Sequence, residues 1–150
     1  MFKLLLFLHL LTAIFAVGPL VGAVTTASRA LRTPDADAAR SAARTIRLYS
    51  YVSVVVVVLG MGLMSAKAPW DESEQVAHFG DAWIWLSLLL WIAAMAVSLG
   101  VVVPTLTRTA NEIGEGRGVG GMTTRVVAGG GVVGLIYAAI VVLMVYQPGG

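Results

Sequence analysis

The stretch IRLYSYVSVVVVVLGMGLMSA, from Ile46 to Ala66, decides the fold of this chain. Arg47 is its only charged residue, and the run Val54–Val58 has the high strand propensity of β-branched side chains in water. A stretch of about 20 mostly apolar residues also matches the hydrocarbon core of a bilayer. In lipid, an isolated strand would leave its backbone groups unpaired, whereas a helix pairs them internally. The sequence therefore predicts a transmembrane helix here.

The composition of the whole chain is typical of a membrane protein. Hydrophobic residues make up 58% of the 150 residues and charged residues only 12%, against about 25% charged residues in soluble domains. The net charge of +2 is small, so nucleic acid is not an expected partner. Because the chain has no cysteine, disulfides, thiolate metal sites and iron–sulfur clusters are excluded.

Three further stretches have the same length and apolar character. Together the four predict an all-α bundle, one transmembrane domain over residues 1–150. The expected spans are about residues 4–24, 46–66, 82–103 and 126–146. Pro104 marks the expected end of the third span, and Gln147 and Pro148 stop the fourth.

The first span could instead be a cleaved signal peptide. Lys3 would be its basic start, and Val21-Gly22-Ala23 resembles a cleavage site. The apolar run is longer than a signal core of roughly 7–15 residues. We therefore expect it to remain as a helix.

The charges in the connecting segments predict the orientation. The first and third loops, residues 25–45 and 104–125, carry nearly all the arginines, whereas the second loop, residues 67–81, is acidic. The positive-inside rule then places loops one and three in the cytoplasm and both termini outside. We expect a multi-pass protein of the bacterial inner membrane. Indoles favour the headgroup interface, so Trp70, Trp83 and Trp85 mark the outer boundary, with Trp91 deeper in the third span.

The first loop predicts the start of a long helix. Thr33 suits the N-cap, Pro34 the first helical position, and Asp35 and Asp37 the positive end of the helix dipole. No helix breaker separates this segment from the second span, so we expect one helix over about residues 34–66. At 1.5 Å per residue it measures about 50 Å, more than the roughly 30 Å hydrocarbon core. The excess should project into the cytoplasm or bend along the membrane.

An arginine stripe follows this cytoplasmic arm. Arg40, Arg44 and Arg47 recur at helical spacing, with Ala39 and Ala43 off the stripe. Such a stripe could bind an acidic partner or anionic lipid headgroups. It could equally serve topology alone, by holding the loop inside, and the two roles are compatible.

Small residues spaced four apart occur in three spans. The pairs are Gly18 and Gly22, Ala96 and Gly100, and Gly130 and Gly134. Such pairs let helix backbones approach closely. We favour internal packing of the bundle for them, with docking of another subunit as the alternative. Pro19 is expected to bend the first helix in its cytoplasmic half.

His9 is the one ionisable side chain well inside an expected span. Such a residue is a functional candidate, and haem or metal binding is the chemistry to weigh. A bis-histidine haem needs a second histidine at matching depth, but His78 lies in the outer loop. We therefore favour a neutral His9 bonded to a neighbouring helix, and we expect no cofactor and no metal.

Other chemistry is not favoured by the sequence. The span cores hold no Asp, Glu, Lys or Arg, which argues against a proton-coupled transporter. Residues 116–121, GRGVGG, match G-x-G-x-x-G, but they lie between two spans and not in a βαβ unit, so a flexible linker is expected. Asp71, Glu72, Glu74 and Asp81 fit no calcium loop, and Asp81 is placed to cap a helix. We expect no enzyme.

The opening Phe7-Leu8-His9-Leu10-Leu11, followed by Gly18 and Gly22, resembles the first helix of a bacterial family of small four-helix integral membrane proteins of unknown function. The resemblance extends to the layout of the chain and its arginine-rich first loop. Members often carry a tryptophan late in this helix, which this chain lacks. The composition also looks like that of mycobacterial inner-membrane accessory subunits, which accompany respiratory complexes and Mce-type lipid importers.

The small size, the lack of catalytic groups in the spans, the small-residue faces and the cytoplasmic arm predict a non-catalytic accessory or stabilising subunit of a larger inner-membrane complex. Among such complexes the resemblance favours a lipid importer. The expected partners are other integral membrane subunits and membrane lipids. The alternatives are a subunit of a respiratory complex, a haem- or metal-binding redox module that uses His9, and a small transporter or lipid-binding protein in its own right.

Overall fold

The chain folds into a bundle of long helices, as a computed structural model shows. The structure describes residues 2–32, 35–67 and 77–148, apart from the side chains of Ala30 and Arg32. Over these residues, four helices are long and apolar enough to cross a membrane: Phe2–Thr26, Ala36–Met64, Ala82–Gly114 and Met122–Tyr146. The all-α, four-span prediction is confirmed, and the protein is a multi-pass membrane protein.

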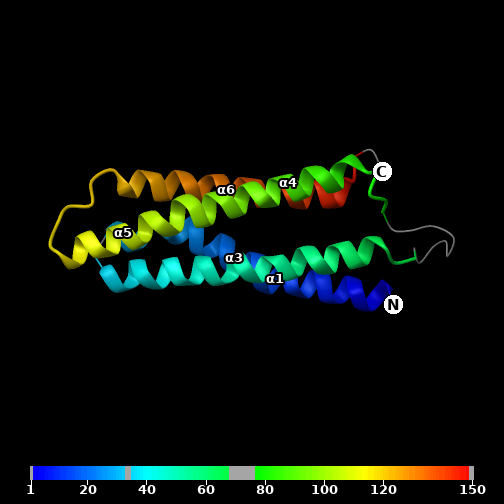
Figure 1. Ribbon diagram of the computed structural model, residues 1–150, viewed down its shortest axis with the longest axis horizontal. Coiled ribbons are helices and arrows are strands. Elements are labelled where there is room, and N and C mark those ends of the chain that lie inside the picture. Colours follow the sequence, from blue (N-terminus) through cyan, green and yellow to red (C-terminus); the bar gives the residue numbers. More distant parts are fainter. Residues whose placement is uncertain (1, 33–34, 68–76, 149–150) are drawn as a thin grey trace.

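The helices run side by side along the length of the molecule, and both termini lie at the same end (Figure 1). In chain order the elements are α1 (Phe2–Thr26), α2 (Arg29–Arg32), α3 (Ala36–Met64), α4 (Ala82–Val97), the π-helical segment η1 (Ser98–Val102), α5 (Val103–Gly114) and α6 (Met122–Tyr146). Helix α1 packs between α3 and α6, α3 packs against α5, and α4 packs against α6. We call the end far from the termini the arginine end. Helix α3 begins there with Arg40 and Arg44, and α5 ends there just before Arg117.

The third long helix does not end at Pro104, so that prediction is wrong. In a regular α-helix the proline ring would meet the carbonyl four residues earlier, that of Gly100. Here the helix widens into η1, in which the Val103 N–H bonds to the carbonyl of Ser98, five residues back. Pro104 then lies in the first turn of α5, where its missing N–H costs little. The widened turn accommodates the proline, and the helix continues to Gly114.

The start of α3 also differs from the prediction. Its N-cap is Asp35, whose Oδ1 accepts hydrogen bonds from the backbone N–H groups of Asp37 and Ala38, each at 2.9 Å. Thr33 was the wrong choice of cap, and the predicted places of Thr33 and Pro34 lie outside the described residues. Ionised Asp35 satisfies two of the N–H groups that a helix start leaves open, so it prevails over a neutral hydroxyl.

The buried core is richest toward the arginine end, where Leu20, Val24, Ile46, Leu106 and Val126 are all buried. Elsewhere the long helices present large apolar side chains outward. Leu135 is 73% exposed and Phe15 67% exposed. Such surfaces suit a hydrocarbon solvent, in which apolar exposure carries no penalty.

Helix α1 continues through Pro19 to Thr26. The predicted bend at Pro19 stays a prediction.

Candidate functional site

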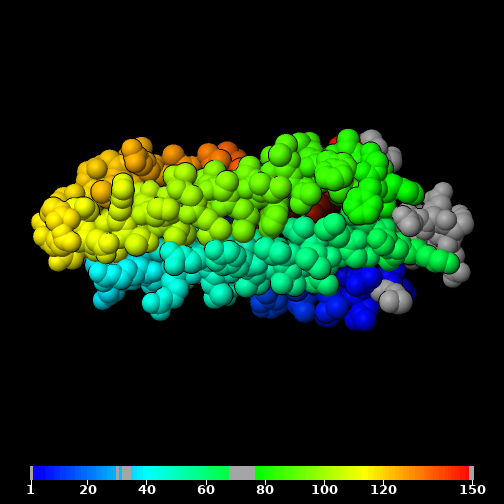
Figure 2. Space-filling view, in the orientation of Figure 1, coloured from blue at the N-terminus to red at the C-terminus, as the bar shows by residue number. Residues whose placement is uncertain are grey.

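The cytoplasmic arm predicted from the first loop is a pair of helices. The first turns of α3 pack against α5 at the arginine end (Figure 2). Ala39, Ala43 and Ile46 of α3 are buried in this contact region, as are Leu106 and Ala110 of α5. The α3 extension therefore continues the axis of the bundle and does not fold back along the membrane surface (Figure 1).

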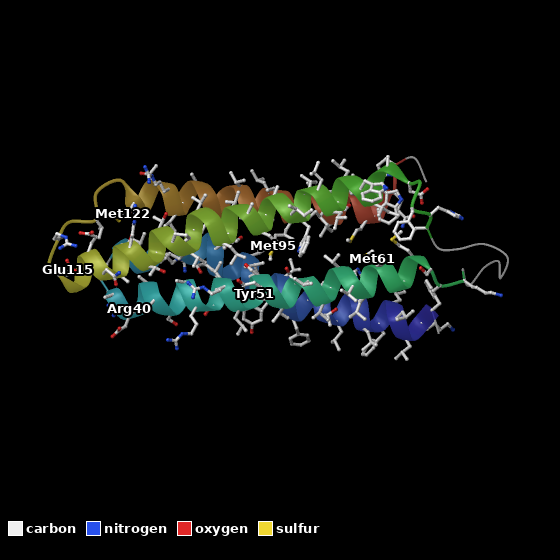
Figure 3. The ribbon with its side chains drawn as sticks, viewed as in Figure 1. Arg40, Tyr51, Met61, Met95, Glu115 and Met122 are labelled. Carbon is white, nitrogen blue, oxygen red and sulfur yellow. The ribbon has the colours of Figure 1, made fainter. Side chains whose placement is uncertain are left out.

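The tip of the arm brings the start of α3 to the end of α5. Arg40 and Glu115 lie at this end of the molecule (Figure 3), and the Arg40 Nη2 atom is 3.7 Å from where a Cβ on Gly114 would stand. Arg40 pairs with Asp37 at 2.9 Å on the surface. Arg117, just past α5, binds Glu112 and Glu115, and the hydrogen bond to Glu112 raises the pKa of Arg117.

Four further arginines on α3, α5 and α6 have no ion-pair partner among the described residues. Arg44, Arg47, Arg108 and Arg125 are exposed, and no carboxylate oxygen in the described part of the chain lies within 4.0 Å of them. Arg47 directly precedes the exposed apolar Leu48, and Arg125 lies two residues before the exposed Val127. These guanidinium groups therefore lie where the surface changes from charged to apolar, the level at which headgroup phosphates are found.

The small-residue pairs divide between the inside and the outside of the bundle. A Cβ on Gly130 would stand 2.3 Å from the carbonyl oxygen of Val24, and one on Gly134 would stand 3.4 Å from Thr25 Cγ2. Internal packing is confirmed for this pair, which marks the crossing of α1 and α6. A Cβ on Gly18 or Gly22 would meet nothing within 4 Å.

The internal-packing interpretation is therefore wrong for Gly18 and Gly22. Ala96 and Gly100 are also exposed. In both pairs the buried stripe of the helix lies on its other side, so the small residues are on the outer surface of the bundle.

A polar cluster, which we had not predicted, lies in the middle of the bundle. The Trp91 Nε1–H donates to Ser53 Oγ across 3.0 Å, and the Ser53 hydroxyl donates to the Ser50 carbonyl at 2.6 Å. Met95 Sδ lies 3.7 Å from Ser53 Oγ, between the two helices (Figure 3). The signal in the sequence was the pair of serines three residues apart in a valine-rich span, together with serines on the Trp91 side of the third span.

Four hydroxyls in the interior have no hydrogen-bond partner among the described residues: Ser50, Ser87, Ser98 and Tyr137. Ser50 and Ser98 are fully buried, and Tyr137 is 6% exposed. The phenol of Tyr137 lies near Ser53 without meeting the geometry of a hydrogen bond to it. Buried polar groups in proteins nearly always have a partner, so Ser50, Ser98 and Tyr137, which lie near Ser53 or in η1, need an explanation. Ser87 lies apart from them, nearer the start of α4.

His9 is buried against α3. Its Nδ1 lies 3.1 Å from the carbonyl oxygen of Val56. Because a carbonyl only accepts, the ring donates from Nδ1. The ring lies on Gly60, where a Cβ would stand 3.1 Å from His9 Cε1. The histidine thus ties α1 to α3, and one nitrogen is engaged by the backbone.

No candidate metal centre is found in the described ranges, where no group of three His, Cys, Asp or Glu residues is close enough to hold an ion. Asp71, Glu72 and Glu74 lie outside these ranges. Asp81 occupies the N-cap of α4, but its carboxylate accepts from the His78 N–H at 2.8 Å and caps nothing in the helix.

The tryptophans at the terminal end are partly exposed. The Trp85 Nε1–H donates to the Phe79 carbonyl at 2.7 Å, and Trp83 is half-buried. Trp70 lies outside the described residues. Trp91 lies deeper in α4 and belongs to the polar cluster.

The glycine-rich match connects α5 to α6. Gly116 and Gly121 have φ of 71° and 75°, in the left-handed region that favours glycine. The segment thus makes the tight turn between two helices.

No family model, no curated protein and no solved structure matches this chain. The resemblance to small four-helix membrane proteins and to accessory subunits therefore stays a prediction.

Proposed function

We propose that the protein is a non-catalytic accessory subunit of a larger membrane complex. The observation that carries the proposal is the α3–α5 arm, a packed helical pair that extends beyond the apolar surface. It bears Arg44, Arg47 and Arg108, which are exposed and have no described carboxylate partner. A rigid pair of helices with uncompensated charge is suited to dock on an acidic surface, because its geometry is fixed before binding.

The outward small-residue faces support the same role. Gly18 and Gly22 leave a shallow strip on α1 that none of the chain's own helices fills. In lipid, close approach of helix backbones at such strips is a main source of helix association. The strip at Gly18 and Gly22 would then bind partner helices in the membrane. The arginine end would bind a second partner or lipid headgroups.

The more specific proposal is a subunit of an Mce-type lipid importer in a bacterial inner membrane, with the arginine end in the cytoplasm. Its support is the resemblance in composition and layout, together with arginines at headgroup level. A subunit of a respiratory complex is the nearest alternative. A redox module built on His9 is less well supported, because a bis-histidine haem needs a second histidine at matching depth and His78 is exposed before the start of α4.

Native purification tests the proposal. The tagged chain is extracted from its own membrane in mild detergent, and co-purifying proteins are identified by mass spectrometry. We expect stoichiometric membrane partners, and loss of at least one with Arg44→Gln/Arg47→Gln. Arg117→Gln is the matched control, since it removes the same charge from an arginine already paired with Glu112 and Glu115. Recovery of only the 15.7 kDa chain, monomeric in several detergents, would overturn the proposal.

A lipid-importer subunit and a redox module give different further results. The first predicts permease and ATPase subunits among the partners. The second predicts visible absorption or bound metal in the purified chain, lost in His9→Ala. A colourless, metal-free preparation that is the same in both forms would remove the redox alternative.

A further inference from the structure

The hydroxyls of Ser50, Ser53, Ser98 and Tyr137 are buried inside the bundle. Ser53 is six residues beyond Arg47 along α3, about 9 Å at 1.5 Å per residue. At this depth no bulk water is available to satisfy a polar group. A hydroxyl here must bond to its own helix, to another helix, or to a water molecule held inside the bundle.

The hydroxyls are close together in space. Ser53 contacts Trp91 and Met95 of α4, and Tyr137 of α6 lies beside it. Ser50 is one turn from Ser53 toward the arginine end, and Ser98 is one turn from Met95 in the same direction, because α3 and α4 are antiparallel. Ser50 and Ser98 therefore lie at one level, where α3 packs against η1.

Bonding back to the same helix satisfies the hydroxyl of Ser53 but not those of Ser50, Ser98 and Tyr137. Thr12, Thr105 and Thr107 each donate to a carbonyl four residues earlier, as hydroxyls in membrane helices commonly do. Ser50 and Ser98 make no such bond. Tyr137 cannot make one, because the phenol holds its hydroxyl far from its own backbone. Ser53 has one lone pair left after it accepts from Trp91.

The π segment borders this group, because Ser98 is its first residue. π-Helical turns inside α-helices occur frequently at functional sites. The cluster thus gathers four hydroxyls, the Met95 sulfur and an indole N–H over about one helical turn of the bundle.

We propose that Ser50, Ser53, Ser98 and Tyr137 form an intramembrane site for ordered water molecules, which bridge α3, η1 and α6. Buried waters typically make about three hydrogen bonds to groups that would otherwise be unsatisfied. A cation is the weaker ligand for this site, because the residues described around it offer no carboxylate to balance its charge in hydrocarbon. The site is independent of the accessory role proposed above.

Hydroxyl-radical footprinting in lipid nanodiscs tests this directly, since side chains next to bound water are labelled even when buried. Tyr137 is 6% exposed, whereas Phe15, on the outer face of α1, is 67% exposed but faces lipid. We expect Tyr137, Trp91 and Met95 to be labelled severalfold more than Phe15, after correction for intrinsic reactivity. Ser50→Ala/Ser98→Ala should lower the labelling of those three and leave Phe15 unchanged.

The melting temperature of Tyr137→Phe shows whether the cluster holds bound water. If the Tyr137 hydroxyl is bound to water, Tyr137→Phe loses that bond and lowers the melting temperature. If the hydroxyl has no hydrogen-bond partner, its removal relieves the free-energy cost of burying an unpaired polar group and raises the melting temperature. Labelling of Tyr137 no greater than that of Phe15, or an unchanged or raised melting temperature for Tyr137→Phe, would overturn the proposal.

Discussion

Gly130 is the position at which one added methyl group should most disturb the bundle. In Gly130→Ala the new Cβ would stand 2.3 Å from the carbonyl oxygen of Val24 and 3.0 Å from its carbon. A normal carbon–oxygen contact is roughly 3.3 Å, so the two helices must separate by about 1 Å. The clashing atoms belong to the backbone of α1 and cannot rotate away, unlike the end of a flexible side chain.

Overpacking a well-packed interior lowers the free energy of unfolding by about 1–3 kcal/mol, and we expect a cost of this size for Gly130→Ala. Replacing glycine by alanine in a helix also gains about 1 kcal/mol in helix propensity, which partly offsets this cost. Gly131→Ala is the matched control, because a Cβ there meets nothing within 4 Å. The propensity gain is common to both variants, so the difference between them isolates the contact with α1.

The assay is unfolding of both variants in one detergent, followed by tryptophan fluorescence. We expect Gly130→Ala to be less stable than Gly131→Ala by about 1–3 kcal/mol. Equal stability of the two variants would show that α1 and α6 do not cross at Gly130, and would refute the reasoning.

Three further predictions concern single contacts. Gly60→Ala should push the His9 ring off α3 and weaken its bond to the backbone, seen as a changed nitrogen chemical shift of the histidine, because the new Cβ would stand 3.1 Å from Cε1. Ser53→Ala should leave the Trp91 N–H without its partner at a cost of about 1–3 kcal/mol, measured as a lower melting temperature. Asp35→Ala should lower stability by about 1 kcal/mol and speed hydrogen exchange at the amides it caps.

Each of these predictions has a control in the chain. Gly62→Ala places its Cβ 4.0 Å from Leu5 Cδ2, an ordinary contact, and should leave the His9 spectrum unchanged. Ser65→Ala removes an exposed hydroxyl and should leave the melting temperature unchanged. Asp37→Ala removes an exposed ion pair with Arg40 and a charge in the first turn but keeps the cap, and it should cost less than Asp35→Ala. If a control matched its variant, the contact in question would not carry the effect.

The number of membrane-length helices could be predicted because it depends on hydropathy alone. The end of the third helix could not, because the rule that proline stops a helix assumes regular α-helical geometry. The π segment before Pro104 departs from that geometry. Ser98 and Val102 of this segment are both fully buried, so its formation depends on the packing around them. The paired arm could not be predicted for the same reason, since α5, which packs against the start of α3, follows η1.

The polar cluster could not be predicted for a different reason. A serine in an apolar span is compatible with bonding to its own helix, so Ser50 and Ser53 gave no sign of a shared site. Only the pairing of α3 with α4 brings Trp91 and Met95 to Ser53. The exposed arginines, by contrast, followed from helical spacing within one segment, and Arg40, Arg44 and Arg47 are all exposed.

The outward orientation of Gly18 and Gly22 could have been predicted from the sequence, with His9 as the reference residue. A polar side chain inside a span faces the bundle and not the lipid. Each residue advances a helix by about 100°, so Gly18 lies about two and a half turns from His9 and faces the opposite side. Ala16 and Leu20 return close to the direction of His9, and both are buried. The histidine thus fixes the rotation of α1, and this rotation leaves the glycine strip facing outward, where a partner helix could reach it.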